Sequence, residues 1–177
     1  EVILSPGETV TCTFTNTKNA HLVVDKVTLP SGDSTSFDFM LRGIEYLKEF
    51  SLTDQANPDD TELAPGSYAV KELQTPEGWS LTGINCGEGV NNLDILLNPG
   101  ETVTCTFTNT KNSTLIVQKT TNPSNDPTLF EINLVSENNR IAPTGVVVDT
   151  ISDSKDKTYS LFPGSYSVNE IVPEGWV

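Results

Sequence analysis

Three polar residues, Lys26, Glu72 and Asn109, lie in segments where every second residue is apolar, and each is in phase with those apolar residues. Such alternation places their side chains on the inward faces of β-strands. Burial lowers the pKa of a lysine and raises that of a glutamate. A neutral Lys26 amine could therefore attack the Asn109 carboxamide, while a protonated Glu72 polarises the carboxamide and carries protons. The products are ammonia and an amide crosslink, formed once per domain rather than in repeated turnover.

A simpler arrangement of the same three residues is the alternative. Lys26 could extend its amine to solvent beside an ordinary ion pair with Glu72, while Asn109 only forms a turn. The intact mass of the chain distinguishes the two arrangements, because only the crosslink removes an ammonia.

The three cysteines are explained by a repeat in the sequence. Residues 5–19 and 98–112 are identical after their first residue, so Cys12 is a copy of Cys105. Cys86 and Cys105 fall within one repeat unit, and we predict a disulfide between them. Cys12 would then stay unpaired, because the unit before it is incomplete. The alternative is three free, buried thiols. A disulfide would indicate a compartment outside the cytosol.

The repeat also defines the units of the chain. Residues 1–19 are predicted to be the closing strands of a preceding unit, residues 20–111 a complete unit, and residues 112–177 a following unit without its last strands. Short alternating segments separated by Pro-Gly turns, with no convincing helix, predict an all-β sandwich.

Two segments need a separate interpretation. Residues 93–97 and 101–110 are expected to form the closing hairpin of the complete unit. Residues 44–52 have an apolar spacing that suits a helical turn, but their surroundings favour a strand.

Two short motifs recur in the complete unit and in the unit after it. Pro-Gly-Ser-Tyr-x-Val-x-Glu occupies 65–72 and 163–170, and Pro-Glu-Gly-Trp occupies 76–79 and 173–176. In the complete unit a lysine-bearing first strand precedes these motifs and Thr-Phe-Thr-Asn-Thr follows them. This order resembles the prealbumin-like domains of bacterial surface proteins and pilins, which are the B-type repeats of collagen adhesins and the SpaA-type pilin domains.

The resemblance implies tandem Greek-key β-sandwiches with a prealbumin-like, or inverse immunoglobulin-like, arrangement. Such domains are stalk modules, and many carry an intramolecular Lys–Asn isopeptide bond promoted by an acidic residue. The resemblance therefore implies these roles for Lys26, Asn109 and Glu72, in a structural module of an extracellular stalk or filament at the cell surface. The alternative is an adhesive module whose end loops recognise a host surface or a glycan. A host ligand could also be bound elsewhere in the full protein.

The incomplete units carry parts of the same constellation. Lys119, Glu170 and Asn16 are the second copies of the three reactive residues. Unpaired strand edges favour pairing with another chain, and a strand of matching pattern can bind such an edge. Residues 1–19 of one copy could therefore complete the last unit of the next, head to tail. Alternatively, the missing strands follow residue 177 in a longer chain. The expected partners are neighbouring repeats or copies of the chain itself.

Composition excludes several classes of function. The net charge is −14, with only 10 lysines and arginines, so nucleic acid is not an expected partner. No apolar run approaches the roughly 20 residues of a membrane span. The single histidine, His21, excludes a Ser-His-Asp triad and a histidine-rich zinc site. We expect no enzyme activity beyond self-crosslinking, no cofactor and no metal. The acidic clusters at 54–62 and 153–156 are interpreted as solvated loops rather than calcium sites.

Overall fold

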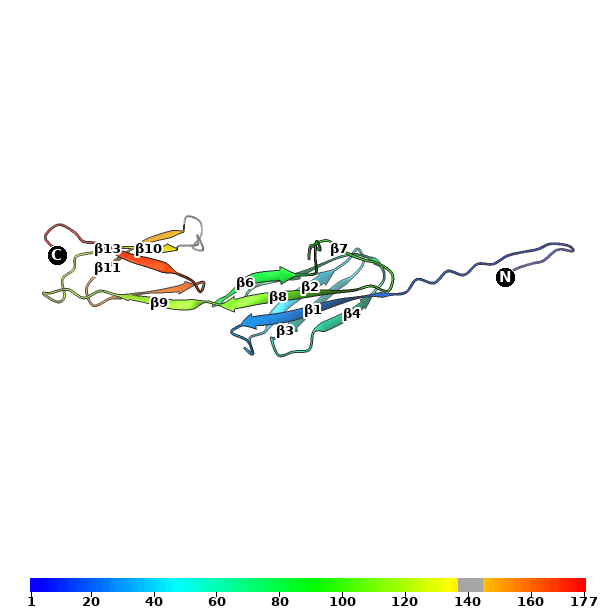
Figure 1. Ribbon diagram of the computed structural model, residues 1–177, viewed down its shortest axis with the longest axis horizontal. Coiled ribbons are helices and arrows are strands. Elements are labelled where there is room, and N and C mark those ends of the chain that lie inside the picture. Colours follow the sequence, from blue (N-terminus) through cyan, green and yellow to red (C-terminus); the bar gives the residue numbers. More distant parts are fainter. Residues whose placement is uncertain (137–144) are drawn as a thin grey trace.

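The computed structural model describes residues 1–136 and 145–177, which form β-strands joined by turns and loops. In this described part of the chain there is no helix long and apolar enough to cross a membrane. The prediction of an all-β fold is confirmed. Eight strands between residues 20 and 111 form a β-sandwich, and five further strands follow it along the long axis of the molecule (Figure 1).

The sandwich consists of two four-stranded sheets. The first has the order β4 (Asp59–Leu63), β1 (Ala20–Leu29), β8 (Thr102–Lys111) and β6 (Trp79–Asn85). The second has the order β3 (Leu47–Leu52), β2 (Phe37–Arg42), β5 (Gly66–Glu72) and β7 (Ile95–Leu97). The first and last strands, β1 and β8, lie side by side and run parallel, so the two ends of the sandwich sequence meet in one sheet.

Alternation along the strands builds the core between the two sheets. In β1 every second residue from 20 to 28 is buried, and the residues between them are partly covered. Phe37, Phe39 and Val70 of the second sheet are fully buried in the same core. The ring of Phe39 meets that of Phe107 on β8 edge to face, with ring centroids 5.1 Å apart. The core therefore joins the two sheets through aromatic contacts.

The expected closing hairpin is wrong. β7 pairs with β5 in the second sheet, whereas β8 lies between β1 and β6 in the first. The connection through Pro99 and Gly100 therefore crosses from one sheet to the other. Gly100 has a φ of 73°, a left-handed conformation that glycine adopts without a steric penalty. The crossing gives β8 hydrogen-bonded neighbours on both edges, which a terminal hairpin would not.

Most of the segment that also suited a helical turn forms strand β3, from residue 47 to residue 52. It pairs with β2, and the ring of Phe50 stacks on that of Phe39, with centroids 5.6 Å apart. Tertiary pairing thus decides the conformation of this segment.

The strands beyond Lys111 repeat the first five strands of the sandwich. They are β9 (Ser113–Gln118), β10 (Phe130–Ser136), β11 (Val146–Ile151), β12 (Asp156–Leu161) and β13 (Tyr166–Ile171). Their sheet orders, β12-β9 and β11-β10-β13, reproduce β4-β1 and β3-β2-β5. The registers also agree, because Ile132 pairs with Glu170 as Phe39 pairs with Glu72. Among the residues described after Lys111, no strand takes the positions of β6, β7 and β8.

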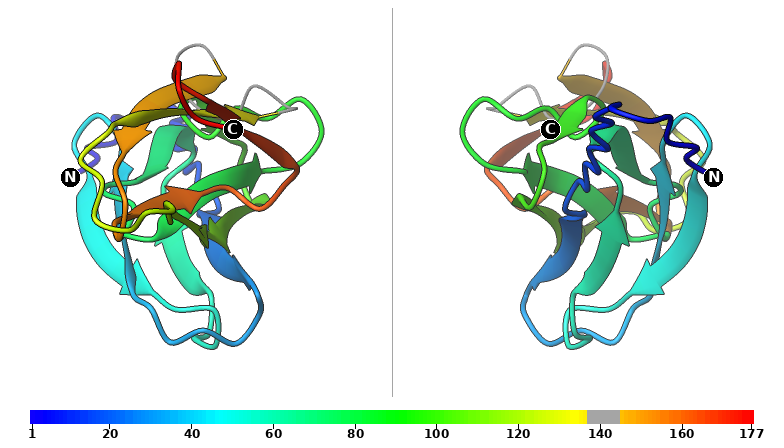
Figure 2. Two further views of the ribbon diagram at one scale, coloured as in Figure 1. Left: turned by 90° about the vertical axis from the view of Figure 1, so that its left-hand side faces the viewer. Right: turned by 90° about the vertical axis from the view of Figure 1, so that its right-hand side faces the viewer.

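The two ends of the sandwich are connected differently. Residues 1–19 form no strand and extend away from the end opposite to β9–β13 (Figure 1). At the other end, Asn112 alone separates β8 from β9. Its backbone N–H donates to the Gly78 carbonyl at 2.7 Å, and its side-chain oxygen accepts from the Ser80 hydroxyl at 2.8 Å. Seen end-on, the two parts lie one behind the other (Figure 2). That residues 1–19 close a preceding unit stays a prediction.

Two aspartates that we interpreted as parts of solvated loops bind backbone groups instead. Asp54 accepts hydrogen bonds from the N–H of Thr28, near the end of β1, and from the N–H of Gly32, in the loop that follows. Its copy Asp153 accepts from the N–H groups of Thr121 at 2.6 Å and Asn125 at 2.7 Å. The interpretation is therefore wrong for these two positions, and also for Asp59, Asp60 and Glu62, which lie in strand β4. The bond from Asn125 is the main cause that lowers the pKa of Asp153 from 3.8 to about 2.

Acid is expected to open the loop that Asp153 closes. Because the pKa of Asp153 is lower in the folded chain, its stabilising effect is present above pH 3.8 and is lost as the pH falls toward about 2. An NMR titration over this range should show the amide signals of Thr121 and Asn125 shifting together. In Asp153→Asn this transition should be missing, whereas Asp156→Asn, which removes the same charge nearby, should keep it. Unchanged titration of both amides in Asp153→Asn would contradict the assignment.

Candidate functional site

The Lys26 amine lies in the interior of the sandwich. Lys26 continues the buried series of β1 and is 2% exposed, and its Nζ lies 4.0 Å from the centre of the Phe37 ring. The amine donates hydrogen bonds to the backbone carbonyls of Val27 at 2.8 Å and Phe107 at 3.3 Å. Within the described residues Lys26 forms no ion pair with a carboxylate. The amine therefore does not extend to solvent.

Asn109 and Glu72 are in direct contact across the core. Asn109 on β8 is fully buried, and its Nδ2 donates to Glu72 Oε1 at 2.8 Å. The Thr75 hydroxyl donates to the same carboxylate oxygen at 2.8 Å. Glu72 Oε2 and Asn109 Oδ1 are buried and have no hydrogen-bond partner among the described residues. A buried polar atom without a partner costs about 1–3 kcal/mol, so this pair is a local exception in a well-satisfied core.

Strand register brings Lys26 toward this pair. In the parallel pairing of β1 and β8, Lys26 lies opposite Phe107 and Thr28 lies opposite Asn109. Lys26 and Asn109 therefore point to the same side of the sheet, diagonally across neighbouring strands. Glu72 comes from β5 in the facing sheet, where it pairs with Phe39 of β2.

The environment of Lys26 shifts its amine toward the neutral form. Desolvation by burial is the largest influence and lowers the pKa of the amine. The negative charges of Glu72, Asp54 and Asp25 oppose this effect in that order, but they do not reverse it. A neutral amine is a nucleophile, whereas a protonated one is not.

The second copies of these residues are arranged differently. Lys119 Nζ lies 2.6 Å from Glu170 Oε1, in an ion pair, and 3.8 Å from the centre of the Phe130 ring. Asn16 is exposed in the segment at the far end of the molecule. The structure thus brings Lys119 and Glu170 together but not Asn16. No asparagine lies beside the Glu170 carboxylate in the described residues, and the Lys119 amine contacts it instead.

An aromatic residue beneath each lysine was missed in the sequence. Phe37 and Phe130 occupy equivalent positions, and each ring is packed edge to face against a tryptophan, Trp79 or Trp176. Their centroid distances are 5.5 Å and 5.1 Å. The recurrence of this phenylalanine in both units was a signal that could have identified it.

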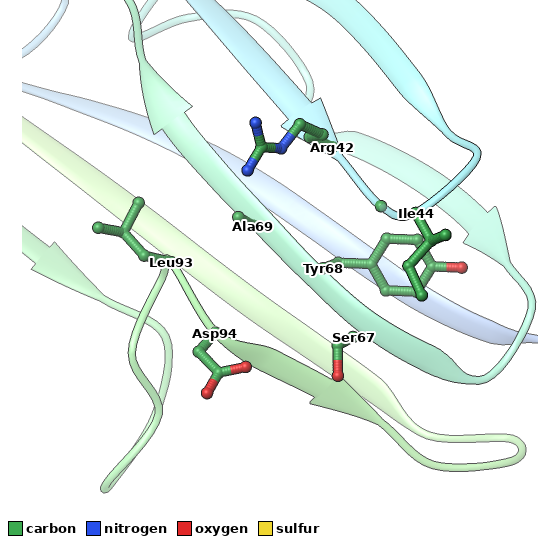
Figure 3. Close-up of a pocket in the computed structure, with 8 residues that line it drawn as sticks. Arg42, Ile44, Ser67, Tyr68, Ala69, Leu93 and Asp94 are labelled. Carbon is green, nitrogen blue, oxygen red and sulfur yellow. The ribbon is translucent and has the colours of Figure 1, made fainter.

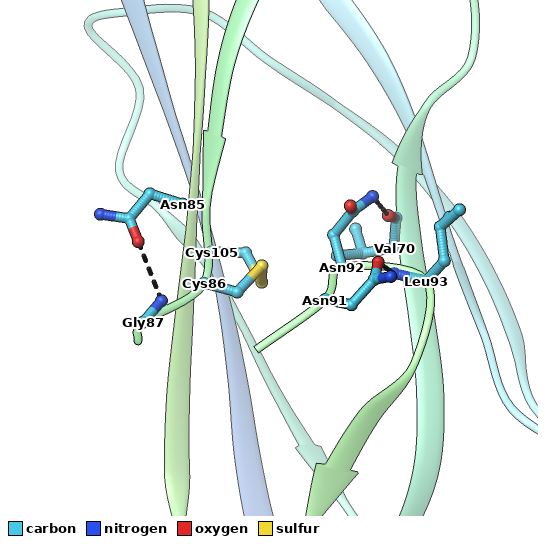
Figure 4. Close-up of a disulfide and its surroundings, with 8 residues drawn as sticks. All are labelled: Val70, Asn85, Cys86, Gly87, Asn91, Asn92, Leu93 and Cys105. Atoms are coloured by element: carbon cyan, nitrogen blue, oxygen red, sulfur yellow. Dashed lines mark hydrogen bonds between the residues drawn. A yellow bond between two sulfur atoms is a disulfide. The ribbon is translucent and has the colours of Figure 1, made fainter. Parts of the chain in front are cut away.

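Cys12 is free and exposed, whereas the predicted disulfide between Cys86 and Cys105 is present (Figure 4). It ties the loop between β6 and β7 to β8. The same loop is held against β5, because Asn92 Nδ2 donates to the Val70 carbonyl at 2.8 Å and the Val70 N–H donates to the Asn92 carbonyl at 2.8 Å. Cys105 and Asn109 are both inward residues of β8, so the disulfide and the candidate crosslink act on the same strand.

A separate hollow of about 440 Å³ lies where the β2–β3 turn, β5 and the segment before β7 meet (Figure 3). Its charged lining residues are Arg42 and Asp94. Tyr68 is its aromatic lining residue. The Tyr68 hydroxyl donates a hydrogen bond to the Ala64 carbonyl at 2.8 Å. No ligand is assigned to this hollow, and the adhesive alternative stays a prediction.

Comparison with known proteins identifies one matching family model, described as a prealbumin-like fold domain, over residues 22–111. No curated protein matches the chain. A solved structure of the Bacillus anthracis TIE protein is similar, with 21% identity over 90% of this chain and 29% of its own, and a TM-score of 0.47. A streptococcal ancillary pilin shares 19% identity over 92% of this chain and 56% of its own, with a TM-score of 0.44. The shaft pilin SpaA of Lactobacillus rhamnosus GG shares 12% identity over 90% of each chain, with a TM-score of 0.33. The chain thus spans less than two thirds of the length of the TIE protein and of the ancillary pilin.

Proposed function

Because the chain belongs to the family of prealbumin-like fold domains, we propose that it is a structural module of an extracellular stalk or filament whose sandwich is closed by a Lys26–Asn109 isopeptide. Neighbouring modules or copies of the chain are its partners. The observation that carries the isopeptide is the meeting of buried Lys26 and Asn109 with the partly buried Glu72. The amine is shifted toward the neutral form, and the carboxamide and carboxylate are in contact at 2.8 Å.

The contact between Asn109 and Glu72 can serve both stages of the reaction. With Glu72 ionised, the Asn109 Nδ2 donates to it, as in the structure. With a proton on Glu72, rotation of the carboxamide lets the acid donate to the carbonyl oxygen instead, which makes the carbonyl carbon more electrophilic. The Asn109 oxygen, which has no partner in the described residues, then gains one.

The reaction needs no further reactant. Lys26 Nζ forms a bond to Asn109 Cγ, and the bond from Cγ to Nδ2 breaks. One proton passes from the amine through Glu72 to the leaving nitrogen, which departs as ammonia. The product amide is uncharged, so the cost of burying a protonated lysine amine is removed.

The position of the bond suits a mechanical role. β1 and β8 are the first and last strands of the sandwich and lie side by side. Lys26 lies in the second half of β1, and Asn109 lies near the end of β8. A pull applied through the two ends of the sandwich would pass from β1 through the crosslink into β8. Residues 27–108 would then carry no load.

Mass spectrometry tests the crosslink directly. We expect the fragment that contains both Lys26 and Asn109, after reduction of the disulfide, to be lighter than its sequence mass by one ammonia, about 17 Da. Glu72→Gln keeps the shape and the hydrogen-bond acceptor but cannot transfer the proton, so its fragment should have the full mass. Lys48→Ala is a matched control, because Lys48 also lies near a carboxylate and a phenylalanine ring but has no such asparagine. The full sequence mass in the unsubstituted chain would refute the isopeptide. It would not contradict the structural role of the module.

A further inference from the structure

A threonine outside the strands holds the carboxylate that contacts Asn109. The Thr75 hydroxyl donates to Glu72 Oε1 at 2.8 Å, and Asn109 Nδ2 donates to the same oxygen at 2.8 Å. The second oxygen, Glu72 Oε2, is buried and has no partner among the described residues. An ionised carboxylate accepts hydrogen bonds and cannot donate them, so both bonds run toward Glu72. The two donors thus fix one oxygen of the carboxylate beside Asn109.

The local sequence explains the position of Thr75. It belongs to the segment between β5 and β6, which crosses from one sheet to the other. It precedes Pro76, and a residue before a proline favours an extended backbone. In the turn that follows, the Trp79 N–H donates to the Pro76 carbonyl at 3.1 Å. The Trp79 ring packs edge to face against Phe37 in the core, so the turn and Thr75 are fixed against the sandwich.

The following unit has a different residue at this place. Residues 73–75 separate the glutamate from the proline in the sandwich, whereas only residues 171–172 do so in the following unit, where Val172 precedes the proline. A valine side chain has no hydrogen-bond donor. In this unit the Glu170 carboxylate contacts the Lys119 amine at 2.6 Å. An ion pair of this kind favours the protonated amine, which is not a nucleophile.

We propose that Thr75 is a positioning residue for the crosslinking reaction, an inference that rests on the proposed function. Its hydroxyl holds the Glu72 carboxylate against Asn109 and away from the Lys26 amine. Among the negative charges that act on this amine, that of Glu72 has the largest effect, so a carboxylate that was free to turn would pair with it. Thr75 bonds to Glu72 and not to a reacting atom, and it therefore acts through the glutamate.

The threonine hydroxyl can keep this contact throughout the reaction. While Glu72 is ionised, the hydroxyl donates to Oε1. When Oε1 carries the proton and donates it to the Asn109 oxygen, the hydroxyl can still donate to a lone pair of Oε1. The covalent step is the one described above: the bond from Lys26 Nζ to Asn109 Cγ forms, and the bond from Cγ to Nδ2 breaks. Glu72 passes the amine proton to the nitrogen that departs as ammonia.

The test compares rates of crosslinking in the full chain. Each variant is made by cell-free translation under conditions that form the disulfide. After synthesis is stopped, the fraction lighter by one ammonia is followed by intact mass. We expect Thr75→Val, which keeps the shape of the side chain and removes the donor, to crosslink about tenfold more slowly, the rate equivalent of one hydrogen bond to a charged group. Thr75→Ser keeps the hydroxyl and should crosslink at close to the unsubstituted rate.

Thr35→Val is the matched control. The Thr35 hydroxyl also donates to a carboxylate, Asp33 Oδ1, at 2.7 Å, and Thr35 is also half-buried, but this pair lies in the segment before β2. Its crosslinking rate should equal that of the unsubstituted chain. Thr75→Ala and Thr75→Ser form a second pair, because they differ from each other in the hydroxyl alone. This pair keeps the test decisive if valine disturbs the turn that begins at Pro76.

The pH profile of the rate distinguishes positioning from simple support of the fold. The charged groups near the Lys26 amine are Glu72 of β5, Asp25 of β1 and Asp54, which follows β3. Of these, Thr75 bonds to Glu72. In Thr75→Val the carboxylate is free to form an ion pair with the amine, which raises the pKa of Lys26, so this variant should reach its full rate at a higher pH than Thr75→Ser. A slower reaction with an unshifted profile would contradict the positioning role.

The outcomes separate this inference from the proposed function. Equal rates for Thr75→Val, Thr75→Ser and Thr35→Val, in a chain that does crosslink, overturn the role of Thr75 and leave the isopeptide standing. A Thr75→Ser chain as slow as Thr75→Ala also overturns that role, because the hydroxyl is then not the cause. The full sequence mass in the unsubstituted chain overturns the isopeptide and the role of Thr75 together.

Discussion

Glu72→Gln is expected to reduce the free energy of unfolding of the sandwich by about 4–5 kcal/mol, the chain-entropy value for opening a crosslinked loop of roughly 80 residues. For a domain of about 100 residues this corresponds to a decrease in Tm of roughly 20 °C. The substitution itself costs little, because glutamine keeps the acceptor for Asn109 Nδ2 and for the Thr75 hydroxyl. The loss is therefore assigned to the crosslink that the variant cannot form.

The difference between Glu72→Gln and the unsubstituted chain should be larger in mechanical unfolding than in thermal unfolding. In the unsubstituted chain, single-molecule pulling through residues 20 and 111 should give no extension from the sandwich, because the load bypasses residues 27–108. With the Cys86–Cys105 disulfide reduced, Glu72→Gln should unfold with the full contour length of those residues. Lys48→Ala serves as the control and should behave as the unsubstituted chain, since it removes contacts of a partly exposed lysine with Asp59, Thr61 and the Phe50 ring and leaves the crosslink in place. Equal extension of Glu72→Gln and the unsubstituted chain would contradict the mechanical role.

Cys105→Ala is expected to have the second largest effect, a loss of about 3 kcal/mol from opening the loop closed by Cys86 and Cys105, whose sequence separation is 19. The loss should depend on the isopeptide, because both covalent bonds hold β8 and each restrains the unfolded chain that the other would restrain. We therefore expect Cys105→Ala to cost more in the Glu72→Gln background than in the unsubstituted chain.

A double-mutant cycle measured by urea denaturation checks this coupling. Reducing agent should reproduce the effect of Cys105→Ala on the unsubstituted chain. Cys12→Ala should leave the denaturation midpoint unchanged, because Cys12 is free and exposed. Strictly additive losses in the cycle would show that the two bonds do not act on the same unfolded ensemble.

Much of the candidate site could be predicted from local patterns. Period-two alternation put Lys26 and Asn109 on inward faces, and both are buried. Comparison of the two repeat copies identified Glu72 as constrained, and the repeat accounted for the pairing of Cys86 with Cys105. These inferences succeeded because side-chain direction in a strand depends on the backbone repeat alone.

Other features depended on contacts between distant segments and could not be read locally. The sequence of β7 and β8 suited a hairpin. In the structure β7 pairs with β5 and β8 pairs with β1, so the two strands belong to different sheets. Likewise, Asp54 and Asp153 look like surface acids, but their carboxylates meet backbone donors that lie far away in the sequence.

The all-β fold, the inward direction of the candidate site residues and the disulfide could be predicted from alternation and repetition, which are local properties. Which of these residues meet depends on contacts between strands that are distant in the sequence. The same lysine and glutamate form an ion pair at Lys119 and Glu170, whereas at Lys26 and Glu72 the carboxylate binds Asn109 instead. The physical reason is the presence of β8 in the sandwich, which supplies both the asparagine and the backbone carbonyl that accepts a hydrogen bond from the lysine.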